Sequence, residues 1–287
     1  MTPGPDRRAF FEQVGLALTA GLVACGGGTA SGSAGTARRR IERIGLQLYT
    51  VRSAMRVDVE ATLARVAEIG YREVEFAGWF DRSPAWLRST LDALGLAAPS
   101  CHVGLDALRA DRDRVFSDAV TLGNQWVVVP SLAEADRATL DAWRRTADEL
   151  NELGVAARAA GLRLAYHNHD VELHPLEGRI PYDLLLESTD ATLVDLEMDL
   201  YWMAEGGGDA VRTMTRWPGR FPLLHVKDRD RSGRMVDVGA GRLDFAGIFA
   251  HADTAGTRHW FVEHDQPGED PFPSIEASFR HLSTLEY

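Results

Sequence analysis

Cysteine is scarce in this sequence of 287 residues, with Cys25 and Cys101 as its two examples. Two cysteines cannot build the dense disulfide framework that holds many small secreted proteins together. The fold must therefore depend on an apolar core. A content of 45% hydrophobic and 25% charged residues is ordinary for a globular protein that buries one.

Positive charge is also in short supply. The 31 lysines and arginines face 42 aspartates and glutamates, which gives a formal net charge of −11, and the longest basic run is Arg38-Arg39-Arg40. A protein that binds nucleic acid needs a cationic face to displace the counterions of the phosphate backbone. The composition argues against nucleic acid as a partner.

Long apolar runs are missing as well. Residues 14–24 form an apolar stretch of 11 residues, whereas a helix that crosses about 30 Å of hydrocarbon takes roughly 20 residues. The stretch follows a twin-arginine pattern at Arg7-Arg8 and ends in Leu22-Val23-Ala24-Cys25, which resembles the lipobox of bacterial lipoproteins. We expect residues 1–24 to be a twin-arginine lipoprotein signal peptide and Cys25 to be acylated. A buried N-terminal helix is the alternative.

Glycine, serine and alanine dominate the residues that follow Cys25. Such a composition is typical of a flexible linker, so residues 25–40 are expected to be the lipidated cysteine and its tether. The folded domain is expected to cover residues 41–287. We therefore expect an exported protein of the periplasm or cell envelope, anchored to the membrane through the acylated Cys25.

From Ile41 onward, short apolar runs alternate with helical patterns about eight times. Alternating strand and helix signals predict a parallel sheet, and eight repeats predict its closure into a single (β/α)₈ TIM barrel. The clearest helical spacing covers residues 139–160. The predicted strands are residues 45–51, 73–76, 99–104, 125–130, 163–169, 193–199, 221–228 and 259–265.

Polar residues gather at the ends of the last four predicted strands. In a TIM barrel the C-terminal ends of the strands form the active site, and alternation along a strand shows which side chains share a face. The grouped residues are His167 and His169 on the fifth strand, Glu197 and Asp199 on the sixth, His225 and Lys227 on the seventh, and Glu263 and Asp265 on the eighth. Any one of them alone could be a helix cap or a buried hydrogen-bonded group. Together they supply the nitrogen and oxygen ligands of a divalent cation, without which the carboxylates would repel one another.

Five segments carry a resemblance to a known family. They are Gly45-Leu46-Gln47-Leu48-Tyr49-Thr50-Val51-Arg52, Tyr166-His167-Asn168-His169-Asp170, Glu197-Met198-Asp199-Leu200-Tyr201-Trp202, His225-Val226-Lys227-Asp228 and Val262-Glu263. These segments resemble the sugar phosphate isomerase/epimerase family, which has the xylose isomerase-like TIM-barrel fold. The resemblance covers roughly residues 41–287. It implies one divalent metal ion, with Mn²⁺ expected first and Zn²⁺, Co²⁺ or Mg²⁺ as alternatives.

The resemblance also implies the ligands. Asp199, His225 and Glu263 occupy three of the family's four ligand positions, but the glutamate that the family carries on the fifth strand is replaced by a His-Asn-His segment. We expect His169 to be the fourth ligand and His167 to be the general base. The alternatives are His167 or Glu172 as the ligand.

Further residues are candidates for the substrate site. Lys227 could place a positive charge next to a developing oxyanion as a second catalytic residue. Glu75, His102 and Trp202 could contact a sugar, although a buried histidine or a packed tryptophan is the alternative at such positions.

The expected function is that of an isomerase or epimerase acting on a sugar or keto-sugar. A divalent ion would polarise the carbonyl group and stabilise the enediolate left when a base removes the neighbouring proton. The same proton removal serves a lyase or hydrolase acting on 3-keto-glycosides, and a non-catalytic periplasmic sugar-binding lipoprotein is the non-enzyme alternative. A phosphodiesterase of the endonuclease IV type needs three zinc ions and a basic groove, which this acidic chain does not suggest. Export favours an unphosphorylated small-molecule sugar as the substrate, because phosphorylated sugars are cytoplasmic metabolites.

Overall fold

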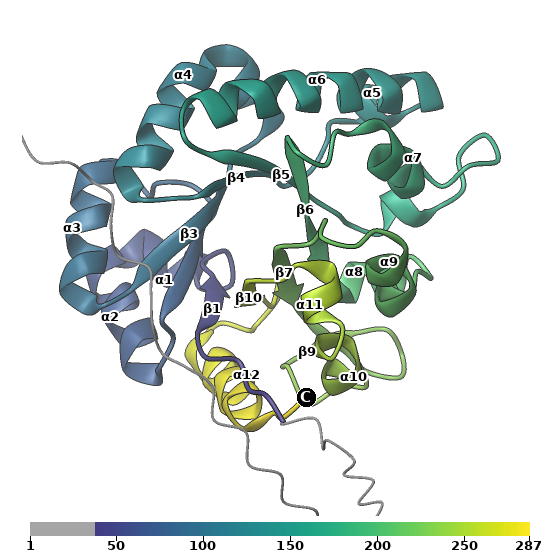
Figure 1. Cartoon of the computed structure of the whole chain (residues 1–287). Helices are drawn as coiled ribbons and strands as arrows, with labels where there is room; N and C mark the ends of the chain where they lie inside the picture. The colour runs from purple at the N-terminus through teal and green to yellow at the C-terminus, as the bar shows by residue number, and fades with distance from the viewer. Residues whose placement is uncertain (1–37) are drawn as a thin grey trace, which may run out of the picture. The chain divides into compact units, whose positions relative to one another are not determined.

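The computed structural model describes residues 38–287 (Figure 1). The predicted signal peptide and the proposed lipidation site at Cys25 lie outside the described residues. Between residues 38 and 287, no helix has both the length and the apolar character needed to cross a bilayer.

Eight parallel strands close into a barrel around which the helices are arranged (Figure 1). The first strand, β1, pairs with both β2 and β10, which completes the ring. The strands are β1 (Ile44–Gln47), β2 (Glu73–Phe76), β3 (Ala97–His102), β4 (Trp126–Val129), β5 (Arg163–His167), β6 (Val194–Asp199), β7 (Leu223–Val226) and β10 (His259–Val262). The predicted single TIM barrel is confirmed, and each of its strands overlaps the predicted range.

Helices follow the strands and cover the outside of the barrel. They are α1 (Arg52–Val57), α2 (Val59–Ile69), α3 (Pro84–Leu94), α4 (Leu105–Leu122), α5 (Glu134–Arg137), α6 (Leu140–Ala159), the 3₁₀ turn η1 (Val171–Leu173), α7 (Pro181–Ser188), α8 (Leu200–Glu205), α9 (Ala210–Arg216), α10 (Phe245–Phe249), α11 (Ala252–Ala255) and α12 (Phe272–Thr284). A small antiparallel pair, β8 (Asp228–Arg229) and β9 (Met235–Val236), follows β7. The predicted helix over residues 139–160 corresponds to α6. Thr139 is the N-cap residue of α6, and its side chain accepts a hydrogen bond from the Ala142 backbone N–H.

Several strands end earlier than predicted. The sequence pattern extends the first strand to Val51, but β1 ends at Gln47 because the chain turns there and the Thr50 N–H donates to the Gln47 carbonyl. Helices α3 and α4 are each followed by a capping glycine, Gly95 and Gly123, whose φ angles of 67° and 91° suit glycine.

The interior of the barrel is divided along its axis. Buried apolar side chains from β4, β5, β7 and β10 form one cluster there, namely Trp126, Val128, Ala165, Leu223 and Phe261. By contrast, His102, His167 and Asp199 are the last residues of β3, β5 and β6. The barrel thus places a packed apolar layer beneath a cluster of polar side chains at the C-terminal ends of the strands.

Candidate active site

Four buried side chains converge where β5, β6, β7 and β10 end. His167, Asp199, His225 and Glu263 each offer one nitrogen or oxygen atom, and these four atoms lie within 4.8 Å of one another. Two imidazole nitrogens and two carboxylate oxygens form a donor set that suits Mn²⁺, Zn²⁺ or Co²⁺. The convergence of these strand ends was predicted, but the histidine that β5 contributes to this group is His167.

His167 is held in the orientation of a metal-binding imidazole. Its Nδ1 lies 3.1 Å from the Pro130 carbonyl oxygen, to which it donates, and its Nε2 lies 3.3 Å from Asp199 Oδ2. Burial lowers the pKa of His167 to about 3, so the ring is neutral and its single proton is engaged at Nδ1. The Nε2 lone pair then faces a carboxylate oxygen, and two electron-pair donors facing each other fit a shared cation.

His225 shows the same arrangement with the two nitrogens exchanged. Its Nε2 lies 2.7 Å from Glu75 Oε2 and donates to it, while its Nδ1 lies 2.7 Å from Glu263 Oε2 and 3.8 Å from Asp199 Oδ2. Although fully buried, Nδ1 has no hydrogen-bond partner of acceptable geometry within the described chain. Burial opposes a charge on this ring, but Glu197 and Glu263 raise the pKa of His225 well above its usual value. The position of Nδ1 between two carboxylates therefore suits a cation, either a proton or a metal ion in its place.

The carboxylates of the group are charged. Burial raises the pKa of Asp199, but the neighbouring Lys227 ammonium outweighs it and brings the pKa to about 2. Burial likewise opposes ionisation of Glu263, yet Lys227 and His225 hold the pKa of that carboxyl well below its usual range. The site therefore concentrates negative charge that a divalent cation would balance.

Lys227 supplies part of that balance. Its Nζ lies 2.9 Å from Asp199 Oδ2, 2.7 Å from Glu263 Oε2 and 3.0 Å from Asp265 Oδ1. Burial opposes the charge, but these three carboxylates raise the pKa of Lys227 above its ordinary value. Lys227 is thus a fixed cation at the edge of the group. It lies at the same end of the barrel as His225, as the alternation along the seventh strand predicted.

A second set of polar side chains lies behind the four. His102 Nε2 lies 2.7 Å from Glu197 Oε2 and 3.2 Å from Glu75 Oε2, and the His102 ring stacks on the His225 ring at 5.1 Å between centroids. Gln47 Nε2 donates to Glu75 Oε2 over 2.7 Å. Glu75 was a candidate for substrate contact, but it is fully buried and supports His225.

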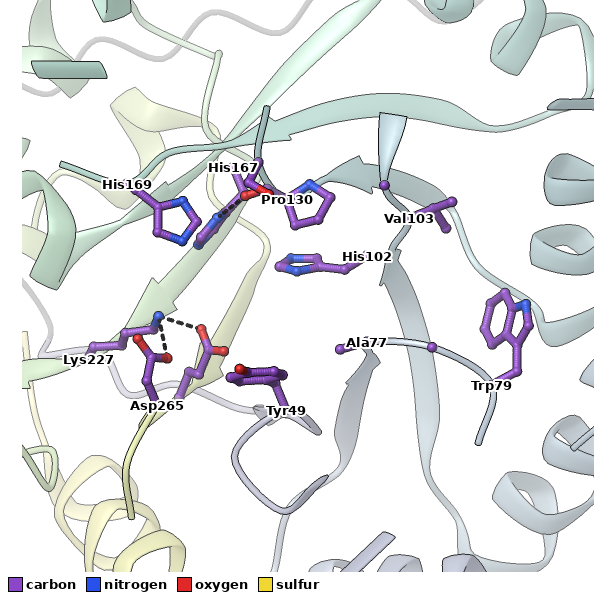
Figure 2. Close-up of a pocket in the computed structure, with 14 residues that line it drawn as sticks. Tyr49, Ala77, Trp79, His102, Val103, Pro130, His167, His169, Lys227 and Asp265 are labelled. Atoms are coloured by element: carbon purple, nitrogen blue, oxygen red, sulfur yellow. Dashed lines mark hydrogen bonds and ion pairs between the residues drawn. The ribbon is translucent and has the colours of Figure 1, made fainter. Parts of the chain in front are cut away.

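A cavity of about 630 Å³ opens beside these groups (Figure 2). The residues that line it include the polar His102, His167, His169, Lys227, Glu263 and Asp265 and the more apolar Tyr49, Ala77, Trp79, Val103 and Pro130, together with Gly78, Gly104 and Ser131. In Figure 2 the two histidines of the fifth strand region and Lys227 lie on one side, Trp79 and Val103 lie on the other, and His102 lies between them.

Three other residues predicted for the site, His169, Trp202 and Glu172, lie outside the group of four ligand atoms. His169 lies past the end of β5 and lines the cavity, with its ring 5.4 Å from the ring of Trp202. Trp202 packs beside His169 and Lys227 and is not among the lining residues. Glu172 is turned away from the group, since its oxygens accept hydrogen bonds from the Tyr166 hydroxyl and the His169 backbone N–H.

Tyr49 is a lining residue to which the sequence reasoning assigned no role. The Arg52 guanidinium carbon lies 3.9 Å from the centroid of the Tyr49 ring, and Arg52 also donates to the backbone carbonyls of Tyr49 and Asp265. Tyr49 belongs to the first segment that carried the family resemblance, and this was the signal in the sequence that could have pointed to it. It reaches the cavity because β1 ends before it, at Gln47.

Comparison with known proteins agrees with this geometry. The family model described as xylose isomerase-like TIM barrel matches residues 63–285. Among curated proteins, an inosose dehydratase from Geobacillus thermodenitrificans is 24% identical over 262 residues, which cover 75% of this chain and 86% of that protein.

Solved structures of similar fold include further enzymes by name. A sugar phosphate isomerase/epimerase from Parabacteroides distasonis is 26% identical, with a TM-score of 0.73 over 86% of this chain and 95% of that one. The IOLI protein, solved with a bound zinc atom, has a TM-score of 0.67 over 83% of this chain and 95% of its own, but at 15% identity its likeness shows the fold alone. Since the family match spans nearly all of the closed barrel and reaches every strand from β2 to β10, the chain belongs to the xylose isomerase-like TIM barrel family.

Proposed function

We propose that this chain is a divalent-metal-dependent enzyme that removes the proton next to a carbonyl group of an unphosphorylated sugar or keto-sugar. The observation that carries this proposal is the group of four ligand atoms within 4.8 Å of one another, at the strand ends and beside a cavity. In a TIM barrel this end of the strands is where catalysis takes place.

We assign the four ligand positions to His167, Asp199, His225 and Glu263. A bound divalent cation would supply Lewis acidity toward the carbonyl oxygen of a substrate and so make the neighbouring C–H more acidic. The protein holds both imidazoles ready by hydrogen bonds on their far nitrogens, from His167 to Pro130 and from His225 to Glu75. Hydrogen bonds of this kind fix the tautomer and the ring orientation.

The assignment of His167 as a ligand changes the candidate for the general base. A base must keep a lone pair free to accept a proton, so it cannot be a metal ligand at the same nitrogen. His169 lines the cavity and lies outside the group of four. We therefore propose His169 as the base and His167 as the ligand, which exchanges the two roles expected from the sequence.

The charge of the cavity bears on the substrate. Of the residues between 38 and 287 that line it, Lys227 alone is a lysine or arginine. Its amine is already within 3.0 Å of three carboxylates, so it has little capacity left for a phosphate group. The charge of the cavity thus favours an unphosphorylated substrate independently of the predicted export signal.

Two outcomes of proton removal have support from relatives. Return of the proton to another carbon or to the other face gives isomerisation or epimerisation, and a structural relative at 26% identity is named a sugar phosphate isomerase/epimerase. Loss of a group from the neighbouring carbon gives a lyase, and a relative at 24% identity is named an inosose dehydratase. We propose the isomerase or epimerase first and the lyase as the second candidate.

The test is exchange of substrate protons with solvent. Protein loaded with Mn²⁺ or Zn²⁺ is incubated in D₂O with free ketoses, an inosose and 3-keto-glucosides, and proton NMR follows the position next to the carbonyl. We expect exchange with at least one compound and its loss in Asp199→Asn. Binding without exchange in the metal-loaded protein would contradict the enzyme and leave a sugar-binding protein.

A further inference from the structure

We propose that the cavity contains a second subsite, distal to the four ligands, that binds the uncharged ring of a glycoside's aglycone. The distal subsite is formed by Ala77, Gly78 and Trp79 after β2 and by Val103 and Gly104 after β3. This inference rests on the proposed function in one respect: the side of the cavity with His167, His169 and Lys227 is taken as the place where the reaction occurs.

The cavity has two chemically different sides. His167, His169 and Lys227 lie on one side and Trp79 and Val103 on the other (Figure 2). A volume of about 630 Å³ is in the range of sites that enclose ligands of drug size. A single monosaccharide at the polar side would leave the distal side unfilled, whereas a glycoside would extend into it.

The loop that carries Trp79 has an unusual backbone. Gly78 has a φ of 108°, and the next two residues after Trp79, Phe80 and Asp81, have φ angles of 50° and 56°. Positive φ is rare for a bulky residue such as phenylalanine, and strained backbone persists where the surrounding structure holds it, often at ligand sites. The Trp79 ring also packs against Phe76 at 6.0 Å between centroids. Trp79 is therefore held at the cavity by both backbone and packing.

The lining of the distal subsite determines what it can bind. It presents an indole ring, small apolar side chains and two glycines. At both glycines a built Cβ would meet nothing within 4 Å, so the space in front of them is open. No charged side chain belongs to this set, so the subsite has no side-chain cation to pair with a phosphate or carboxylate. An aromatic or sugar ring stacked on the indole face satisfies these conditions.

The experiment compares two glucosides that differ only in the aglycone. Isothermal titration calorimetry on the metal-loaded full chain measures the dissociation constants of a methyl and a phenyl glucoside of the same anomeric configuration. We expect the phenyl glucoside to bind about tenfold more tightly to the unaltered protein, an advantage typical of one buried aromatic contact.

Variants of two tryptophans locate the effect. Trp79→Ala should bring the ratio of the two dissociation constants close to one, and Trp79→Phe should keep most of it. The matched control is Trp86→Ala, because Trp86 lies on α3, the next helix along the chain, is 36% exposed and does not line the cavity. It should leave the ratio unchanged.

The outcomes separate this inference from the proposed function. No difference between the two glucosides in the unaltered protein, including failure of both to bind, would overturn the distal subsite, as would a ratio that survives Trp79→Ala. Proton exchange on keto-sugars is measured independently of this ratio. A preference for the phenyl glucoside without any exchange would support the subsite and contradict the proposed enzyme.

Discussion

Glu75 offers a test of how the protein orients the proposed metal ligands. Its Oε2 accepts hydrogen bonds from His225 Nε2 and from Gln47 Nε2, each over 2.7 Å, and the side chain is fully buried. In Glu75→Gln the shape is kept but the negative charge is lost. A hydrogen bond to a neutral amide oxygen is about half as strong as one to a carboxylate, so the His225 ring is less firmly oriented and its Nδ1 is less basic.

The expected effect is on metal affinity. Loss of a partner behind a metal-binding histidine costs about 10- to 100-fold in affinity, or about 1.4–2.7 kcal/mol. Because both hydrogen bonds at Oε2 are short and shielded from water, we expect a value in the upper half of this range. Competitive titration of Zn²⁺ or Mn²⁺ against a chromogenic chelator measures the dissociation constant directly.

Glu73 provides a matched control on the same strand. Its Oε2 lies 2.7 Å from His259 Nδ1, so it is also a buried carboxylate paired with a histidine, but it stands at the start of β2. Glu73→Gln should lower stability without changing metal affinity. Equal metal affinity in Glu75→Gln and the unaltered protein would refute the supporting role of Glu75, and an equal loss in Glu73→Gln would show that the effect is only structural.

Two other predictions concern the anchor and the barrel. If Cys25 is acylated, the protein should fractionate with membranes and Cys25→Ala should release it; an unaltered protein found only in the soluble fraction with its first residues retained would contradict this. Gly45→Ala should destabilise the fold by about 1–3 kcal/mol in urea unfolding, because a built Cβ lies 2.4 Å from the Phe261 ring and 3.1 Å from the Trp260 carbonyl oxygen. An unchanged unfolding midpoint would mean that the contact between β1 and β10 relaxes freely.

The strands of the barrel could be predicted because each carries a short apolar run between helical patterns. Their ends could not, since a strand ends where its neighbours stop pairing or where a local turn competes. Tyr49 illustrates this: the sequence pattern continues past it, but the turn that begins after Gln47 places it at the cavity. Alternation along the chain nevertheless predicted that Lys227 and Asp265 lie at the C-terminal ends of the strands, where both line the cavity.

The choice between His167 and His169 was beyond the sequence. Both are on the same face if the strand continues, so alternation treats them alike. In the structure β5 ends at His167, which pairs in register with Glu197 of β6, and Asn168 then accepts a hydrogen bond from the Asp199 backbone N–H. The chain leaves the sheet there, and His169 comes to lie at the wall of the cavity.

Glu75 shows a different limit. Its place at the end of β2 suggested contact with substrate, as for any polar side chain at that end of a barrel. Which strand-end side chains reach the cavity depends on what covers them, and His102 and His225 lie over Glu75. Burial of this kind arises from packing across the barrel between residues that are far apart in the sequence.

Metal content of two histidine variants tests the proposed centre most directly. Elemental analysis of the purified protein should give about one divalent ion per chain, with most of it lost in His167→Ala and nearly all of it kept in His169→Ala. His264→Ala is the control, because His264 is next to Glu263 but lies outside the group of four; it should keep its metal. Metal lost from His169→Ala and kept in His167→Ala would contradict the assignment and restore His169 as the ligand.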